Sequence, residues 1–381
     1  MSEDEIEQYA VSAMRRMLNK HVDWTSGGQR DAVIASLRAE RDIVAILPTG
    51  SGKSMIPAVP LSLMPQTIAY IICPLISLAH DWIRRLRVWH IPSQYIEDEA
   101  TPFSSIARAI VVTTDIAIRQ RFRHHMLEKS MNCPRGQIIL DEGHYIRTTQ
   151  EYRECMREQW SIRCLPYQFI VLSATIPPPM LEGIKHDLML STTALVVREP
   201  SNRPELRYVI RSAIESSQNR LTEVANICKA EIRSFMPEDR GLIFVSRISD
   251  GASISKALGY DFYHAQLEKE GRKKAMERWV AGGKHAIMVC TSAIAAGVDY
   301  GACQFTVHSG TPFNMVDFVQ QCGRAGRDGK EARCYIIPDR STMPILARND
   351  GDESGRAALY SALFCSSSCF RKSSVSAVHL G

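Results

Sequence analysis

The chain has 381 residues, of which 45% are hydrophobic and 23% are charged. These values are ordinary for globular proteins and exclude a disordered, collagen-like or coiled-coil chain, and the length suggests two or three domains. The formal net charge of +5 permits a phosphate-rich partner without requiring one.

From the sequence we expect neither membrane insertion nor secretion. The most apolar stretch, residues 68–76, is about half the roughly 20 residues that a membrane-spanning helix needs. The acidic start, MSEDEIEQY, lacks the basic and then apolar pattern of a secretory signal. None of the eleven cysteines forms a CxxC pair, so we expect reduced thiols in an intracellular protein.

The first part of the chain predicts a parallel α/β domain. Residues 1–19 are expected to form a short amphipathic helix, and a second helix is expected over 29–39. Short apolar, β-branched runs follow the pattern of buried parallel strands, which are apolar on both faces. These runs are 43–47, 68–72, 109–113, 137–140 and 169–172. We therefore expect a first domain over residues 20–198.

The second part repeats this rhythm. Residues 199–206, EPSNRPEL, contain two prolines among polar neighbours and are expected to form an interdomain linker. A second domain is expected over 207–345, with a helix at 265–281. Its predicted strands are 241–245, 286–290, 304–308 and 333–337. The Ser-rich tail, 346–381, is expected to be weakly ordered.

The clearest motif is LPTGSGKS, which follows the first predicted strand. Its glycines let the backbone wrap a phosphate with N–H groups pointing inward. Lys53 is expected to reach the β- and γ-phosphates of a nucleotide, and Ser54 to hold Mg²⁺. The general phosphate-loop pattern begins with Gly, whereas this loop begins with Leu47. The predicted nucleotide-binding residues are Thr49, Gly50, Ser51, Gly52, Lys53 and Ser54.

A second motif, QIILDEGH, ends a predicted strand in two carboxylates. Ligands of parallel sheets bind at the carboxyl ends of the strands. Asp141 is expected to hold Mg²⁺ through water, and Glu142 to orient and deprotonate an attacking water. A helix N-cap is the alternative interpretation, and the position of this pair in the same series as Lys53 favours a nucleotide site.

Two further motifs follow. LSATIPP places Ser173 and Thr175 at another strand end, where they relay the state of a γ-phosphate or form an ordinary hydroxyl-rich turn. FVQQCGRAGRDG places Arg324 and Arg327 in a second domain that has no phosphate loop of its own. We expect these two to act as arginine fingers toward a nucleotide on the first domain, and a solvated basic helix end is the alternative.

In this order the motifs resemble a superfamily 2 helicase, and the RecQ-like branch most closely, over about residues 20–345. CPLISLAHDW (73–82) and VVTTD (111–115) are similar to segments that contact the nucleic-acid backbone. The stretches SNRPELRY, GLIFVSR, CTSAIAAGVD and GRAGRDG are also similar. The combination looks like the short RecQ-like helicases of fungal genomes.

The resemblance implies two tandem RecA-like P-loop domains that use ATP and Mg²⁺. It implies 3′-to-5′ movement on single-stranded and forked DNA, a nuclear location, and work in DNA repair and recombination. By the same resemblance Gln29 reads the adenine, with Trp24 stacking nearby, and His144 couples the nucleotide state to DNA contacts. Asp299 and Gln320 line the interdomain cleft.

The sequence also departs from the family. The acidic box is usually DEAH or DECH, whereas Gly143 makes it DEGH here, at an expected cost of about 0.5–1 kcal/mol in local order. Where the family carries an aromatic-rich loop, this chain has the charged stretch 145–160. Cys369 resembles the first ligand of the family's zinc region, but the other three ligands are absent, so no zinc site is predicted.

Three alternatives to a DNA helicase remain open at this point. The first is an RNA helicase of the same superfamily. The second is a DNA-dependent ATPase that binds or translocates without unwinding. The third is an inactive nucleic-acid-binding remnant.

Overall fold

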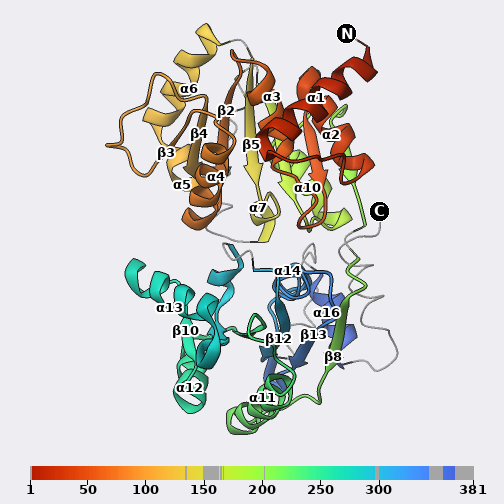
Figure 1. The fold of residues 1–381 in the computed structure, drawn as a ribbon, viewed down its shortest axis with the longest axis vertical. Helices are drawn as coiled ribbons and strands as arrows, with labels where there is room; N and C mark the ends of the chain where they lie inside the picture. The colour runs from red at the N-terminus through yellow and green to blue at the C-terminus, as the bar shows by residue number, and fades with distance from the viewer. Residues whose placement is uncertain are drawn as a thin grey trace. The chain divides into compact units, whose positions relative to one another are not determined.

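The structure is a computed structural model that describes residues 2–133, 135–148, 163, 165, 167–200, 202–296, 300–342 and 355–364. It divides into two compact units, Met1–Ser201 and Asn202–Gly381 (Figure 1). Each unit contains one parallel sheet flanked by helices. The predicted fold class, two α/β domains in tandem, is confirmed.

The first unit contains a seven-stranded sheet in the order β3-β4-β2-β5-β6-β1-β7, and all neighbouring strands are parallel. Strands β5, β6 and β1 are therefore adjacent, which brings the segments after them to one edge of the sheet. The strands are β1 (Ile43–Ile46), β2 (Ile68–Cys73), β3 (Ser93–Ile96), β4 (Ala109–Thr113), β5 (Gly136–Asp141), β6 (Gln168–Ser173) and β7 (Leu195–Arg198).

Helices of the first unit cover this sheet. Ser2 and Ser26 begin the first two of them by accepting hydrogen bonds from backbone N–H groups three residues later, which stabilises each first turn. The helices are α1 (Glu3–Leu18), α2 (Gly27–Arg38), α3 (Met55–Leu63), α4 (Ile76–Val88), α5 (Thr114–Ala117), α6 (Gln120–Asn132), α7 (Tyr145–Thr148) and α10 (Pro178–Asp187).

The N-terminal helix α1 is part of the first unit. It contacts α2 and α3, and its residues Ala10, Ala13, Met14 and Met17 are buried in the core of that unit (Figure 1). The Arg30 guanidinium ties α2 to α1 through ion pairs with two glutamates of α1. The helix expected at 1–19 is therefore present, and it completes the core rather than preceding it.

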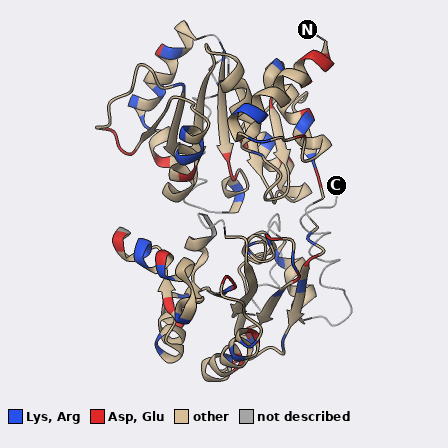
Figure 2. Ribbon diagram, in the orientation of Figure 1, with Lys and Arg blue, Asp and Glu red and all other residues tan. Residues whose placement is uncertain are grey.

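The second unit contains a six-stranded parallel sheet in the order β10-β11-β9-β12-β13-β8. Its strands are β8 (Leu206–Ile210), β9 (Arg240–Val245), β10 (Asp261–Tyr263), β11 (Ile287–Cys290), β12 (Cys303–Ser309) and β13 (Ala332–Ile337). Its described α-helices are α11 (Ser217–Ile232), α12 (Ile248–Leu258), α13 (Lys269–Ala281), α14 (Met315–Cys322) and α16 (Arg356–Phe364). Lys, Arg, Asp and Glu lie mainly on helices and loops, and the strands are mostly free of them (Figure 2).

Several predicted boundaries differ from the structure. Strands β3, β7, β8 and β10 were not predicted, and β8 begins at Leu206, inside the expected linker. The helix expected at 265–281 begins only at Lys269, because a turn with a hydrogen bond from the Leu267 N–H to the His264 carbonyl precedes it. The predicted tail, 346–381, lies mostly outside the described residues, which include only the helix α16 of it.

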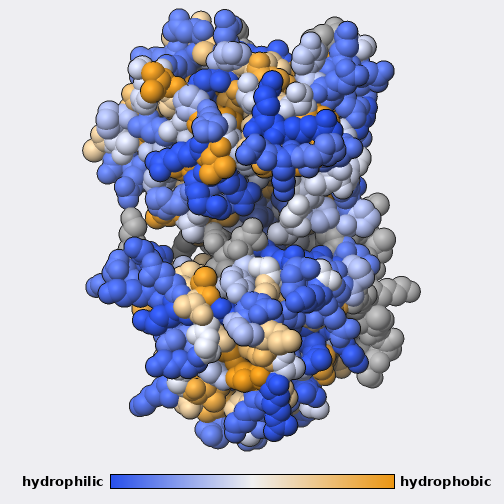
Figure 3. Space-filling model, in the orientation of Figure 1, coloured by the Kyte–Doolittle hydropathy of each residue, from blue (hydrophilic) through white to orange (hydrophobic). Residues whose placement is uncertain are grey.

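Apolar side chains gather in the cores of the units. On the face seen in Figure 3, hydrophilic residues cover most of each unit and apolar ones are scattered among them. Across the described ranges the cysteines are free thiols, and all but Cys133 are buried. No helix in the part of the chain that the structure describes is long and apolar enough to cross a bilayer.

Candidate nucleotide and nucleic-acid sites

The predicted phosphate loop joins the end of β1 to the start of α3. Gly50 and Gly52 have φ angles of 86° and 75°, in the left-handed region that favours glycine. The Lys53 ammonium donates hydrogen bonds to the carbonyl oxygens of Leu47 (2.9 Å) and Pro48 (3.0 Å), at the entry to the same loop. A bound triphosphate would compete with these two carbonyls for the lysine.

Gln29 of α2 lies against this loop. Its side-chain oxygen accepts from the Thr25 N–H (2.9 Å), and its Nε2 donates to the Gly52 carbonyl (3.3 Å). A Cβ at position 52 would lie only 2.3 Å from that Nε2, so a side chain there would displace the glutamine. The structure thus brings Gln29 to the phosphate loop, and its role toward adenine stays a prediction. The Trp24 indole N–H is bonded to Glu7 (2.7 Å).

The two predicted carboxylates lie at the end of β5, which is separated from β1 by the single strand β6. Asp141 is the last residue of the strand, and Glu142 follows with a φ of 50°. Burial raises the pKa of Asp141 to about 6, the neighbouring Glu142 carboxylate adds to this rise, and the Trp82 indole and Lys53 charge oppose it. Lys53 therefore lies close enough to the acidic pair to act on it electrostatically.

The residues expected to hold Mg²⁺ fit that ion chemically, because a hydroxyl and a carboxylate are the hard oxygen ligands it prefers. Both are engaged by side chains of α4. The Trp82 indole N–H donates to Asp141 Oδ2 (2.8 Å), and the Arg85 guanidinium donates to Ser54 Oγ (2.8 Å). The sequence motifs gave no sign of either contact.

His144 connects the acidic box with the end of β6. Its ring is fully buried, and Nδ1 lies 2.9 Å from Ser173 Oγ and 3.4 Å from a Glu142 carboxylate oxygen. Ser173 Oγ also accepts from the Thr175 N–H (3.1 Å). Burial, with a smaller contribution from Lys53, lowers the pKa of His144 to about 3, so the ring is neutral. The structure brings the three predicted coupling residues together, and coupling itself stays a prediction.

Gly143 has a packing role that the sequence did not indicate. Its N–H donates to the Leu172 carbonyl (2.9 Å), and a Cβ at this position would lie 2.3 Å from Val171 Cγ1 in β6. In this protein Val171 occupies the space that the side chain of an alanine at position 143 would need. The expectation of a merely looser backbone misses this contact.

Gly143→Ala is expected to lower the free energy of unfolding by about 1–3 kcal/mol, because it overpacks a filled site. In Gly143→Ala/Val171→Ala the space returns, so the loss should be smaller than the sum of the two single losses. Urea unfolding followed by circular dichroism measures all four proteins. A Gly143→Ala protein as stable as wild type would contradict the role of Val171.

The paired arginines follow α14 in the second unit. They lie in the loop after that helix rather than on it, and both Arg324 and Arg327 are half-buried. Arg327 Nε donates to the Gly323 carbonyl (3.2 Å). Gln320 lies within α14, and Asp299 lies outside the described residues.

Arg203, which sequence reasoning did not single out, holds the loop that carries these arginines. Its guanidinium donates to the carbonyls of Ala325 (2.9 Å), Gly326 (3.0 Å) and, at 3.4 Å, Gly323. It also forms an ion pair with Glu205. Arg203, the second residue after the boundary between the units, therefore helps to fix the shape of the arginine loop.

A pocket opens at the carboxyl ends of β9, β11 and β12. Hydroxyl groups from two quoted stretches line it, among them Ser246 of GLIFVSR and Thr291 of CTSAIAAGVD. Phe313 is 66% exposed at this pocket. The full lining is Phe244, Val245, Ser246, Thr291, Ser292, His308, Gly310, Pro312, Phe313, Asp317 and Gln321.

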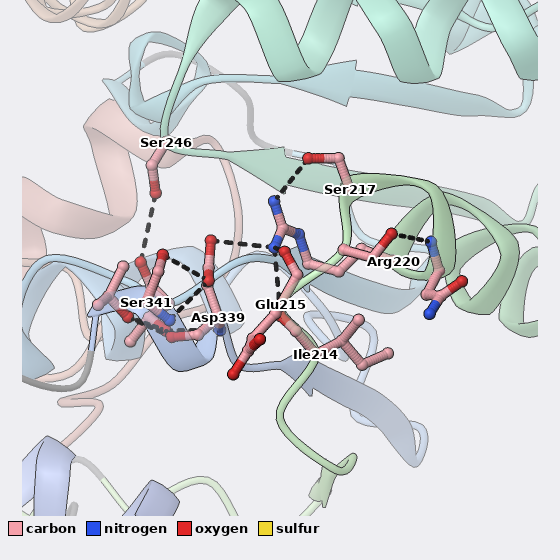
Figure 4. Close-up of polar contacts among 11 residues, drawn as sticks. Ile214, Glu215, Ser217, Arg220, Ser246, Asp339 and Ser341 are labelled. Atoms are coloured by element: carbon pink, nitrogen blue, oxygen red, sulfur yellow. Dashed lines mark hydrogen bonds and ion pairs between the residues drawn. The ribbon is translucent and has the colours of Figure 1, made fainter.

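The loop that follows β12 at this pocket is held from two sides (Figure 4). Ser246 Oγ donates to the Thr311 carbonyl (3.4 Å), and Thr311 Oγ1 accepts from the Asp339 N–H (2.9 Å). Asp339 in turn forms an ion pair with Arg220 at the start of α11 (3.0 Å). These contacts give this side of the pocket a defined shape.

No cluster of three or more His, Cys, Asp or Glu side chains suited to a metal occurs within the described ranges. Cys369, the residue that resembles a zinc ligand, lies outside them. The stretch that stands in place of the aromatic-rich loop is described only over residues 145–148, where it forms α7.

Comparison with known proteins identifies two helicase families. The chain matches the DEAD/DEAH box helicase family over residues 27–182 and the helicase conserved C-terminal domain over 223–329. A Caenorhabditis elegans protein carrying the name ATP-dependent DNA helicase Q1 is 29% identical over 80% of this chain and 51% of its own length. The ATP-dependent DNA helicase hus2/rqh1 of Schizosaccharomyces pombe is 27% identical over 87% of this chain and 26% of its own.

The rat ATP-dependent DNA helicase Q1 is 27% identical over 81% of this chain and 52% of its own length. The chain thus spans about half the length of its Q1 relatives. Solved structures share the fold. The DEAD-box helicase Mss116 bound to ssRNA superposes with a TM-score of 0.72 at 15% identity, covering 94% of this chain and 79% of its own. The DUF1998 helicase MrfA bound to DNA gives 0.69 at 19% identity, covering 87% and 48%.

Proposed function

Because the chain belongs to the RecQ-like helicases of superfamily 2, we propose that it hydrolyses ATP to move along single-stranded DNA and unwind duplexes. One observation carries this proposal. The phosphate loop, the acidic box and the Ser173 turn follow three adjacent parallel strands of the first sheet, β5, β6 and β1, at their carboxyl ends. Open parallel sheets bind their ligands at the carboxyl ends of the strands.

In the proposed reaction, a water oxygen attacks the γ-phosphorus of ATP while the bond from that phosphorus to the ADP oxygen breaks. Glu142 orients this water and accepts its proton. Lys53 leaves its two loop carbonyls and donates to the β- and γ-phosphate oxygens. When bound, Mg²⁺ would be held by Ser54 and, through water, by Asp141, and would neutralise phosphate charge. Gln29 is proposed to read the adenine.

Arg324 and Arg327 are proposed to reach the γ-phosphate when the two units close on ATP, with Gln320 and Asp299 also lining the closed site. Guanidinium groups placed there would stabilise the charge of the transition state. Loss of the γ-phosphate would remove their partner and let the units separate. Each cycle would thus convert a binding event into a hinge motion.

Single-stranded DNA is proposed to lie on both units through its backbone phosphates. On the first unit, the stretch 73–82 begins at the last residue of β2, and the stretch 111–115 spans the end of the adjacent strand β4 and the start of α5. On the second, the pocket that contains Ser246 and Thr291 is proposed to face the strand. Such binding should weaken with salt and be nearly independent of sequence. We also propose 3′-to-5′ movement, a preference for forked DNA and a nuclear role in repair and recombination, because the family resemblance implies them.

Glu142→Gln is expected to bind ATP as wild type does and to slow its turnover by about 10²–10⁴-fold, the usual contribution of a general base. The amide keeps the shape of the side chain and cannot take a proton from water. ATP affinity is measured by equilibrium binding and turnover by phosphate release, each with and without single-stranded DNA. A Glu142→Gln protein that turns over like wild type would contradict the assigned base.

The same assay on the wild type tests the nucleic acid. Single-stranded DNA should stimulate phosphate release more than RNA of the same length, and stronger stimulation by RNA would favour the RNA helicase alternative. Displacement of a strand from a forked duplex separates a helicase from an ATPase that only moves or binds. A wild type without ATP turnover under any of these conditions would leave only the inactive remnant.

A further inference from the structure

Helix α4 reaches the nucleotide site with two side chains. Trp82 and Arg85 are three residues apart, so they share one face of the helix. Trp82 contacts Asp141, and Arg85 contacts Ser54. These are the two groups proposed to hold Mg²⁺, and they come from different segments, the phosphate loop and the end of β5.

The contact of Trp82 fixes the direction of the Asp141 carboxylate. The indole N–H is a donor only, and it takes Oδ2 at 2.8 Å. The other oxygen, Oδ1, accepts from the Glu142 backbone N–H at 3.1 Å. Trp82 is only 5% exposed, so the indole is itself held in place. Groups that orient a metal ligand in this way raise metal affinity.

The contact of Arg85 has the opposite consequence. Its guanidinium lies 2.8 Å from Ser54 Oγ and directs a positive charge at the oxygen that would face the cation. The same guanidinium is paired with Asp81 one turn earlier, at 2.6 Å. Arg85 can therefore release the serine and keep a charged partner. Metal binding would have to displace the arginine from the hydroxyl.

We propose that Trp82 and Arg85 are positioning residues with opposite effects on Mg²⁺ binding at the nucleotide site. Trp82 orients Asp141 for the ion and favours its binding, whereas Arg85 engages Ser54 and opposes it. This inference rests on the proposed function, because it takes Ser54 and Asp141 as the ligands of Mg²⁺. The stretch 73–82, which resembles a DNA-contacting segment, includes the first half of α4. A shift of α4 on DNA would therefore reach both metal ligands through one rigid helix.

The test measures nucleotide binding rather than turnover. The affinity for a fluorescent mant-ADP is determined with Mg²⁺ and with EDTA, and the ratio of the two gives the gain due to the ion. Trp82→Phe keeps the ring and loses the N–H, so the gain should fall about tenfold. Arg85→Met keeps the length and removes the charge, so the gain should rise above that of wild type. The affinity in EDTA should stay within about twofold in both.

Arg84→Met is the matched control. Arg84 is on the same helix, pairs with the same Asp81, and is more exposed than Arg85. Its gain should equal that of the wild type. An unchanged gain in Trp82→Phe or a lowered gain in Arg85→Met overturns the inference, and so does an equal rise in Arg84→Met. Arg85 is less buried than Trp82, so Arg85→Met keeps the test valid if Trp82→Phe fails to fold. A wild type with no gain from Mg²⁺ contradicts the proposed metal ligands instead.

Discussion

Arg327→Ala is expected to slow ATP turnover by about 10³-fold or more while leaving ATP affinity largely intact, as is usual for an arginine finger. The affinity should persist because the ground-state contacts are proposed to come from the phosphate loop of the first unit. The turnover should fall because the guanidinium is proposed to meet the γ-phosphate only when the units close. Phosphate release at saturating ATP and single-stranded DNA measures the effect.

A matched control lies in the same loop. Lys330 is exposed and its ammonium lies 3.8 Å from an Asp328 carboxylate oxygen, so Lys330→Ala removes one positive charge from this loop without touching the proposed finger. It should turn over ATP like the wild type. If Arg327→Ala does so too, the two-unit site is wrong. If both variants are equally slow, the effect belongs to the charge of the loop and not to a finger.

Lys53→Ala is expected to abolish detectable ATP turnover, with or without DNA. The substitution removes the ammonium proposed to bridge the β- and γ-phosphates. The change should be local, since the two carbonyls that lose this donor, those of Leu47 and Pro48, lie in the same loop as the lysine. Phosphate release over long incubations measures the loss, and thermal unfolding checks that the protein remains folded.

Residual activity would be informative here. Turnover by Lys53→Ala above a tenth of the wild-type rate would show that hydrolysis does not depend on this loop, or that a second ATPase contaminates the preparation. Gel filtration of Lys53→Ala separates these two cases, because true residual activity follows the protein peak and the activity of a contaminant need not.

The sequence predicted the interior of each sheet well and its borders poorly. The nine predicted strands all exist and differ from the structure by at most one residue at an end. The strands that were missed, β3, β7, β8 and β10, are the four edges of the two sheets. Interior parallel strands are buried on both faces and read as apolar runs, whereas an edge strand such as β10 (DFY) is short and only partly buried.

The site shows a similar division. Residues that act as a contiguous motif, such as Gly52 and Lys53 or Asp141 and Glu142, can be recognised from their spacing. Contacts between motifs cannot, because the partners are brought together only by the fold. Trp82 stands in a stretch noted for its resemblance to a DNA-contacting segment, yet its indole reaches an acidic residue of β5. Arg203 stands in an expected linker, yet it holds the arginine loop.

The burial of α1 has a consequence for where this protein can be cut. All residues of α3 from Met55 to Leu61 are buried, and α1 packs against that helix directly behind the phosphate loop. Covering one Met side chain contributes about 1.5–3 kcal/mol, and Met14 and Met17 are both covered. A fragment that begins at residue 20, where the recognisable motifs start, would expose the apolar surface of α3 that α1 covers. Such a fragment should aggregate. The proposed nucleotide site thus depends for its support on α1, a helix that supplies none of the predicted catalytic or binding residues.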